Sequence, residues 1–240
     1  MNSIDFKNGR YKPERSEILR YMGYSGQKTD ENIYGLIDRC IDEMIDIVRP
    51  RYTYSVFDIK IDTDKSGSPC ISLIGANLKL TGNDIYEHLR ECRKCAVMAV
   101  TLGIAADNAI RVAQSSDMTK AVIYDACATE LVEKACDFVE DEIKALAESE
   151  GRGINFRFSP GYGNLPIEVQ PTLINTLDAG RKTGITVTPS MLMTPSKSVT
   201  AVIGFTTLLY KNKKKRSKCD ICSMRGNCAF RKRGTTCGRV

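Results

Sequence analysis

The pattern of apolar and polar residues predicts a helix followed by a hairpin near the start of the chain. Apolar residues recur at three- and four-residue steps over 33–48, which is typical of a helix with one buried face. Asp30 can cap this helix. Residues 52–61 then alternate apolar and polar side chains, and 71–80 reads as a returning strand. The turn sequence at 66–69 joins the two runs into an antiparallel hairpin.

The rest of the chain alternates between helical and strand patterns. A continuous apolar run at 95–103 predicts a buried strand, and Asp117 can cap a long helix over 117–149. The residues at 81–84 offer caps for a helix over 84–92. The other expected elements are helices at 13–22, 105–114 and 166–179 and strands at 156–159, 185–188 and 198–209, with a Met-rich loop at 189–195.

These elements predict an α+β fold, with a mixed, largely antiparallel twisted sheet flanked by helices. Charge divides the chain further. Residues 211–240 carry 11 basic residues and one acidic residue, whereas the first 210 residues hold 24 basic and 28 acidic ones. We therefore expect one α+β domain over 1–210 and a small basic, cysteine-rich tail over 211–240.

The composition indicates a protein of the cytoplasm. No stretch approaches the roughly 20 apolar residues of a membrane span, and the polar N-terminus lacks the apolar core of a signal peptide. The ten cysteines therefore do not predict a disulfide scaffold. We expect no membrane partner.

The usual catalytic machinery is missing from the sequence. The chain has one histidine, His88, which we expect to be solvated on a surface helix. The sequence contains neither a phosphate-binding G-x-x-x-x-G-K-[ST] loop nor a G-x-G-x-x-G turn after a strand. These gaps disfavour a hydrolase, a kinase or a dehydrogenase, and they favour a protein that positions a bound reactive cofactor.

The most distinctive segment is RFSPGYGNLP, at residues 157–166. The expected strand stops at Pro160, Gly161 allows a ligand to approach the main chain, and Tyr162 projects from the turn. Arg157 precedes the turn, and its guanidinium suits a carboxylate. The segment predicts a site for a zwitterionic amino acid. The alternative is an ordinary strand–turn–helix junction with a surface arginine.

R-x-x-P-G-Y resembles the S-adenosylmethionine-binding signature of the activation domain of cobalamin-dependent (vitamin B12) methionine synthase. The sequence MTPSKSV at 193–199 is similar to the M-x-P-x-x-S-V segment of that domain. The resemblance covers roughly 85–240, and it is closest to free-standing homologues that replace an activation domain missing from a shortened synthase. It implies no catalytic residue. The cofactor-binding residues that it implies are Arg157, Ser159, Pro160, Gly161, Tyr162, Met193, Pro195, Lys197 and Ser198.

In the family, by this resemblance, the arginine binds the carboxylate of S-adenosylmethionine and the tyrosine lies between the sulfonium and the corrin. One position departs from the pattern. An aromatic pair follows the M-x-P-x-x-S-V segment of the fused synthases, where this chain has Ile203-Gly204. The resemblance thus implies an S-adenosylmethionine site that lacks one aromatic contact.

The function that the resemblance implies is reactivation of methionine synthase by reductive methylation of cob(II)alamin. The cobalamin is held by the partner, a synthase without its own activation domain. The electron comes from a flavodoxin or a ferredoxin, and S-adenosylmethionine supplies the methyl group. No side-chain proton transfer is needed, which agrees with the missing acid–base machinery.

The tail carries a second candidate site. Cys219, Cys222, Cys228 and Cys237 fall within 19 residues, and four thiolates can hold zinc or an iron–sulfur cluster. The alternative is a basic tail with incidental cysteines. A further C-x2-C pair, Cys92 and Cys95, is expected to be buried thiols.

Two other functions stay open on sequence alone. One is an iron–sulfur protein that transfers electrons to a corrinoid without S-adenosylmethionine. The other is a metal-binding module that contacts nucleic acid or a protein. The basic run at 211–218 fits a nucleic-acid contact, an acidic partner protein or a solvated linker, and we expect no nucleic-acid partner.

Overall fold

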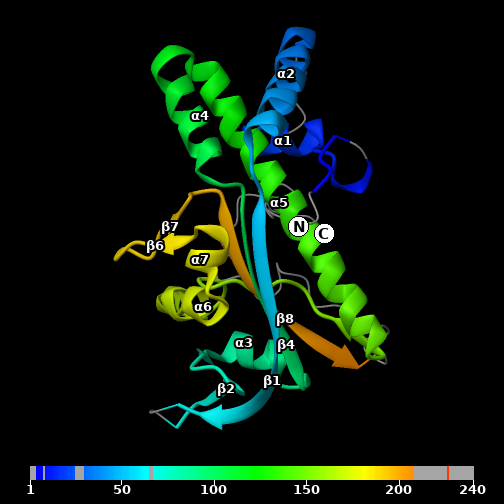
Figure 1. The fold of residues 1–240 in the computed structure, drawn as a ribbon, viewed down its shortest axis with the longest axis vertical. Helices are drawn as coiled ribbons and strands as arrows, with labels where there is room; N and C mark the ends of the chain where they lie inside the picture. The colour runs from blue at the N-terminus through cyan, green and yellow to red at the C-terminus, as the bar shows by residue number, and fades with distance from the viewer. Residues whose placement is uncertain (1–3, 8, 25–29, 65–66, 208–225, 227–240) are drawn as a thin grey trace. The chain divides into compact units, whose positions relative to one another are not determined.

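The computed structural model describes residues 4–7, 9–24, 30–64, 67–207 and 226, and Figure 1 shows the fold. The helices are α1 (Arg15–Tyr21), α2 (Glu31–Ile47), α3 (Asn83–Leu89), α4 (Ile104–Ser116), α5 (Met118–Ser149), α6 (Gln170–Leu177) and α7 (Ala179–Thr183), with short 3-10 turns η1 (Gly9–Tyr11) and η2 (Ile167–Val169). The strands are β1 (Arg51–Thr63), β2 (Pro69–Leu73), β3 (Lys79–Thr81), β4 (Lys94–Thr101), β5 (Arg152–Ile154), β6 (Thr186–Val187), β7 (Met193–Thr194) and β8 (Ser198–Thr207).

The chain forms two compact units. Unit 1 comprises Met1–Thr53, Met98–Glu142 and Leu177–Val199, and unit 2 comprises Tyr54–Val97, Ile143–Thr176 and Thr200–Val240. Unit 1 is mainly helical, with α1, α2, α4, α7 and most of α5. Unit 2 holds α3 and most of the sheet strands. The predicted boundary between residues 210 and 211 lies outside the described residues.

The main sheet has six strands in the order β3-β2-β1-β4-β8-β5, and β6 and β7 form a separate ribbon. β1 pairs with β2, β2 with β3, and β5 with β8, all antiparallel. The predicted hairpin is confirmed, since Ile61 lies opposite Ile71. Its second strand is shorter than predicted, because the chain turns after Leu73 and returns as β3. The α+β class with a largely antiparallel sheet is confirmed.

The buried strand and the long helix also match the sequence pattern. Every residue of β4 after Lys94 is buried, as its apolar run predicts. The Asp117 carboxylate accepts a hydrogen bond from the amide of Lys120 at 3.0 Å, so Asp117 does cap α5. Asp30 caps α2 in the same way, through the amide of Asn32 at 3.0 Å.

Three predicted elements of the second half are wrong in detail. The strand expected at 156–159 lies at β5 instead, and Phe158 makes only a single bridge to Val202. The helix expected at 166–179 is divided, because Asp178 takes a left-handed conformation (φ 52°) between α6 and α7. The loop expected at 189–195 is partly a hairpin, in which Val187 pairs with Met193.

The helix α3 begins within the predicted capping segment, and its N-cap residue is Gly82. Gly82 has no side chain with which to make a capping bond. The carboxylate of Asp84 instead accepts a hydrogen bond from the amide of Asn164 at 3.1 Å. The capping residues at 81–84 therefore predicted correctly where the helix begins.

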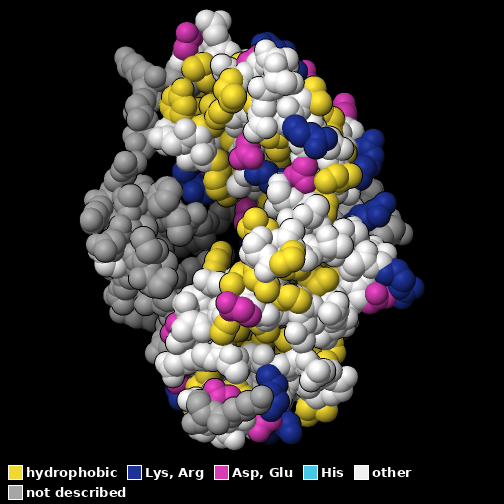
Figure 2. Space-filling model, turned by 90° about the vertical axis from the view of Figure 1, so that its left-hand side faces the viewer, with side chains coloured by type: hydrophobic (Ala, Val, Ile, Leu, Met, Phe, Trp, Pro, Cys, Tyr) yellow, Lys and Arg dark blue, Asp and Glu magenta, His cyan; other side chains and the backbone are white. Residues whose placement is uncertain are grey.

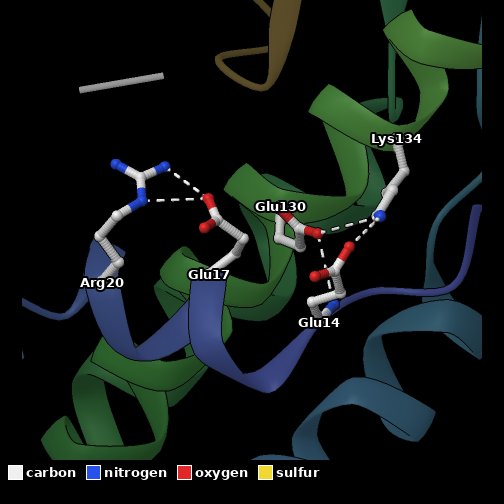
Figure 3. A network of polar contacts seen from close by, with 5 residues as sticks. All are labelled: Glu14, Glu17, Arg20, Glu130 and Lys134. Atoms are coloured by element: carbon white, nitrogen blue, oxygen red, sulfur yellow. Dashed lines mark hydrogen bonds and ion pairs between the residues drawn. The ribbon is translucent and has the colours of Figure 1, made fainter. Parts of the chain in front are cut away.

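In unit 1, a network of charges joins the segment at the start of α1 to α5 (Figure 3). Lys134 lies 2.8 Å from the carboxylate of Glu14 and 3.8 Å from that of Glu130. Glu130 also accepts from the amide of Glu14 at 3.3 Å. The side chains of Glu130 and Lys134 are buried, with exposed fractions of 0% and 5%. A buried charge needs a partner of opposite sign, so this network fixes α1 on α5.

Candidate functional site

The predicted binding segment forms a compact bend in unit 2. After its bridge at Phe158, the chain turns so that the amide of Tyr162 donates to the carbonyl of Ser159 at 3.0 Å. The amide of Gly161 donates to the carbonyl of Leu165 at 2.9 Å. Gly161 has a φ of +87°, a conformation that disfavours any side chain. The bend is thus a defined structure closed by its own hydrogen bonds.

Arg157 lies at the base of this bend and is buried, with 8% of its surface exposed. The alternative of a surface arginine is therefore wrong. A guanidinium is seldom buried unless anions or carbonyl groups surround it, so a buried Arg157 is a fixed cation beside the bend.

Tyr162 projects from the bend, as the sequence predicts, and 49% of its surface is exposed. Its ring meets the buried ring of Phe158 edge to face, with 6.3 Å between centroids. One side of the tyrosine is therefore supported, while much of its surface faces solvent and is available to a ligand.

His88 is not the solvated residue that its helix pattern predicts. Its ring packs on those of Phe156 and Phe158, at centroid distances of 4.4 and 5.1 Å. Nε2 lies 3.0 Å from the carbonyl oxygen of Phe156. Because a carbonyl can only accept, Nε2 carries the hydrogen and donates it. Burial lowers the pKa of His88 to about 4, so the ring is neutral at neutral pH.

The position that departs from the aromatic pair of the fused synthases is tightly enclosed. A Cβ at Gly204 would lie 2.6 Å from Cys92 Sγ and 2.7 Å from Asn155 Nδ2. The amide of Gly204 also donates to Asn155 Oδ1 at 2.6 Å. An aromatic side chain has no room here without movement of its neighbours, which gives the departure a structural reason.

The second predicted segment, 193–198, belongs to unit 1. It begins as β7 and is fixed on the elements around it. Ser198 Oγ, which is buried, donates its one hydrogen to the carbonyl of Pro195 at 2.7 Å and lies at hydrogen-bond distance, 2.8 Å, from the hydroxyl of Thr101. Ser196 bonds to the carboxylate of Asp107 on α4 through its amide, at 2.8 Å, and through its hydroxyl.

The side chain of Lys197 also bonds to a neighbouring helix. Its ammonium lies 2.8 Å from Asp125 Oδ1 and 2.9 Å from Thr129 Oγ1, both on α5. Its side chain is 14% exposed. Lys197 therefore holds the loop on α5. The structure brings Met193, Pro195, Lys197 and Ser198 together in unit 1, and it brings Arg157, Ser159, Pro160, Gly161 and Tyr162 together in unit 2.

Unit 1 also has an open groove of about 360 Å³ between α2, α4 and α5. Val112, which lines it, is 65% exposed, and Figure 2 shows yellow side chains gathered in the upper part of its view. None of the predicted cofactor-binding residues lines this groove. Its lining residues are Ile47, Asn108, Ala109, Val112, Ala113, Ser116, Lys120 and Tyr124.

The predicted metal ligands Cys219, Cys222, Cys228 and Cys237 lie outside the described residues. Within the described part of the chain, His, Cys, Asp and Glu side chains form no group of three or more that could hold a metal. Cys95 is fully buried and Cys92 is partly so. Burial raises the pKa of both thiols, that of Cys92 to about 12, so both are protonated at neutral pH, as expected of buried thiols.

Asp84 and His88 are neighbours of the bend that no sequence pattern indicated. Their contacts, to Asn164 and to Phe156, span 80 and 68 residues of sequence, and local patterns carry no signal for such pairs. Among the helices of the described residues, none is both long enough and apolar enough to cross a membrane.

No curated protein matches the chain. A crystal structure of the MetH reactivation domain bound to AdoHcy has a similar fold, with a TM-score of 0.59 and 14% sequence identity over 94% of this chain and 82% of that one. Residues 91–208, which include the bend and the 193–198 loop, match the family described as vitamin B12 dependent methionine synthase, activation domain. Through this segment, the chain belongs to the activation-domain family of vitamin B12 dependent methionine synthases.

Proposed function

We propose that this chain binds S-adenosylmethionine at the bend formed by residues 157–163 and reactivates a cobalamin-dependent methionine synthase that lacks its own activation domain. The observation that carries the proposal is that one bend of the matched family segment holds a buried arginine, Arg157, and a half-exposed tyrosine, Tyr162. The similar MetH domain was crystallised with AdoHcy, an analogue of S-adenosylmethionine, which supports this ligand class.

Each group of the bend has a part in the proposed binding. The guanidinium of Arg157 binds the carboxylate of the methionine moiety through paired hydrogen bonds, which are strong in a buried setting. The ring of Tyr162 faces the sulfonium and gains from the attraction between a cation and an aromatic face. The amides of Gly161 and Tyr162 already donate within the bend, so we assign Ser159, Pro160 and Gly161 the role of shaping the contact surface.

The loop with Met193, Pro195, Lys197 and Ser198 covers the edge of the corrin in this proposal. Its polar side chains at Lys197 and Ser198 are engaged by α5 and β4, so the loop offers a fixed surface. Such a surface suits a large planar partner, because little flexibility is lost when the complex forms.

The partner would hold the cobalamin, whose cobalt would accept the methyl group, and a flavodoxin or ferredoxin would supply the electron. The residues of this chain hold the methyl donor in line and exclude competitors, which is catalysis by proximity and orientation. They move no proton, and the neutral His88 beside the bend agrees with that assignment. The chain is therefore an accessory module of a methyltransferase.

Titration calorimetry tests the proposal, with S-adenosylmethionine added to the chain alone and to the chain with a cobalamin-loaded synthase. We expect Arg157→Ala to weaken binding by about 2–3 kcal/mol, roughly 30- to 150-fold. Arg157→Lys keeps the positive charge but loses the paired N–H donors of the guanidinium, so it should recover only part of the affinity. Arg181→Ala is the control, since Arg181 is an exposed arginine paired with Asp178. Absence of heat and of a complex under both conditions contradicts the proposal.

A further inference from the structure

The helix α3 contacts the bend at both of its ends. Asp84 and His88 are four residues apart on α3, and residues at this spacing lie on the same face of a helix. Asp84 contacts Asn164, which follows the turn, and His88 contacts Phe156, which immediately precedes Arg157. One face of one short helix thus holds the segment that carries Arg157 and Tyr162.

The contact at Asp84 is reciprocal. The amide of Asp84 donates to Asn164 Oδ1 at 2.9 Å, and the amide of Asn164 donates to Asp84 Oδ2 at 3.1 Å. Two glycines allow this approach. A Cβ on Gly82 would lie 2.5 Å from the carbonyl oxygen of Asn164, and a Cβ on Gly163 would overlap the carboxylate of Asp84. Both glycines have positive φ, at +119° and +51°.

The contact at His88 combines a hydrogen bond with ring packing. Nε2 donates to the carbonyl of Phe156 at 3.0 Å, and the ring also packs on Phe158. Phe158 in turn supports the ring of Tyr162. The side chain of Asn155 donates to the main-chain carbonyl of His88 at 2.9 Å, which adds a fourth hydrogen bond between α3 and this segment.

We propose that α3 is a clamp that holds Arg157 and Tyr162 in the arrangement that the methyl donor requires, with Asp84 and His88 as positioning residues. This inference rests on the proposed function and extends it, because α3 precedes the matched segment 91–208. A bend held in its binding conformation loses less entropy when a ligand binds, so the clamp raises affinity without touching the ligand.

The test compares Asp84→Ala with Asp84→Asn in the full chain. Asparagine keeps an oxygen that can accept from the Asn164 amide, whereas alanine does not. The first measurement is AdoHcy affinity by calorimetry. The second needs no ligand and is hydrogen exchange of the main-chain amides of 159–165. We expect Asp84→Ala to bind AdoHcy about tenfold more weakly and to exchange about tenfold faster in the bend, and Asp84→Asn to match the natural chain in both.

Thermal unfolding separates positioning from loss of the fold. If Asp84→Ala fails to fold, Asn164→Ala and Asn164→Asp form a second pair with the same logic at the other side of the contact. The clamp is overturned if the alanine variants bind and exchange like the natural chain, or if the conservative variants lose as much as the alanine variants.

The two proposals can fail separately. If the natural chain binds neither AdoHcy nor S-adenosylmethionine, with and without the loaded synthase, the proposed function fails and the exchange data alone decide on the clamp. Faster exchange confined to the alanine variants then supports the clamp, and unchanged exchange overturns it. If the natural chain binds but Asp84→Ala has unchanged affinity, the proposed function stands and the clamp falls.

Discussion

The ammonium of Lys197 lies 2.8 Å from a carboxylate oxygen of Asp125. This pair ties the 193–198 loop to α5. Because 57% of the Asp125 side chain is exposed, we expect Lys197→Met and Asp125→Asn each to lower the free energy of unfolding by only about 0.5–1 kcal/mol. The double variant should lose no more free energy of unfolding than either single variant does. Urea titrations of the three variants measure this. A tenfold loss of S-adenosylmethionine affinity in Lys197→Met but not in Asp125→Asn would instead show that Lys197 contacts the ligand.

Gly204→Ala should destabilise the chain. Its new methyl group would lie 2.8 Å or less from Leu89, Asn155 and Cys92, so these neighbours must move, at a cost of about 1–3 kcal/mol. Gly180→Ala is the matched control, because the nearest atom to its Cβ is 3.6 Å away and alanine favours a helix. The measurement is the midpoint of urea unfolding. Equal midpoints for the two variants would mean that position 204 has room for a side chain.

The free energy of unfolding should fall in acid, because the folded chain disfavours protonation of His88. The folded state holds its pKa at about 4, against an ordinary value of 6.5, so the unfolded chain binds the proton first as the pH falls. The stability that the neutral His88 contributes is complete above pH 6.5 and is lost as the pH falls through about 4. Between pH 7 and pH 5 we expect a loss of about 1–2 kcal/mol that His88→Gln does not show. Because the chain has one histidine, the difference in slope between the two proteins belongs to His88, and identical slopes contradict its burial.

The charge network at the start of α1 should be costly to break. Lys134→Met leaves the buried carboxylate of Glu130 without its cation, and we expect a loss of about 3 kcal/mol in unfolding free energy. Adding Glu130→Gln removes the unbalanced charge and should recover at least half of that loss. Lys144→Met, which breaks an exposed pair with Glu148 on the same helix, should stay within about 0.5 kcal/mol. If the two lysine variants are equally stable, the network does not hold α1.

We also predict that the cysteines of the tail bind zinc or an iron–sulfur cluster. Anaerobic purification followed by metal analysis and an absorption spectrum identifies which, since a cluster absorbs broadly near ~400 nm and zinc does not. Replacing Cys219 and Cys222 together by serine should remove the metal, whereas replacing Cys92, which is partly buried, and Cys95, which is fully buried, should leave the metal content unchanged. A natural chain purified without either metal contradicts the prediction.

The sequence predicted the fold well where one periodic pattern determines one element. The stripe over α2, the apolar run of β4 and the long face of α5 each gave the right structure, because burial alone decides them. The hairpin of β1 and β2 followed from its turn. The helix after Pro166 was less predictable, since the left-handed Asp178 that divides it depends on local backbone geometry rather than on apolar periodicity.

The candidate site was predictable in its central residues and not in their surroundings. Proline, glycine, tyrosine and arginine within six residues indicated a bend with a cation, and the structure has that bend. The enclosure of Gly204 depends on Asn155 and Cys92, which are distant in sequence and which a linear pattern cannot bring together. His88 was misjudged for the same reason, because its helix presents it to aromatic rings that lie far along the chain.

The placement of α3 before the matched segment limits what a shortened or transplanted version of this protein can do. The supports of the bend are encoded 80 and 68 residues upstream of the residues that they hold. A polypeptide that starts at residue 91 would keep the arginine and the tyrosine and lose both supports. Anyone who grafts this loop onto another scaffold would need to carry the helix along with it, or to supply an equivalent acceptor and an equivalent ring.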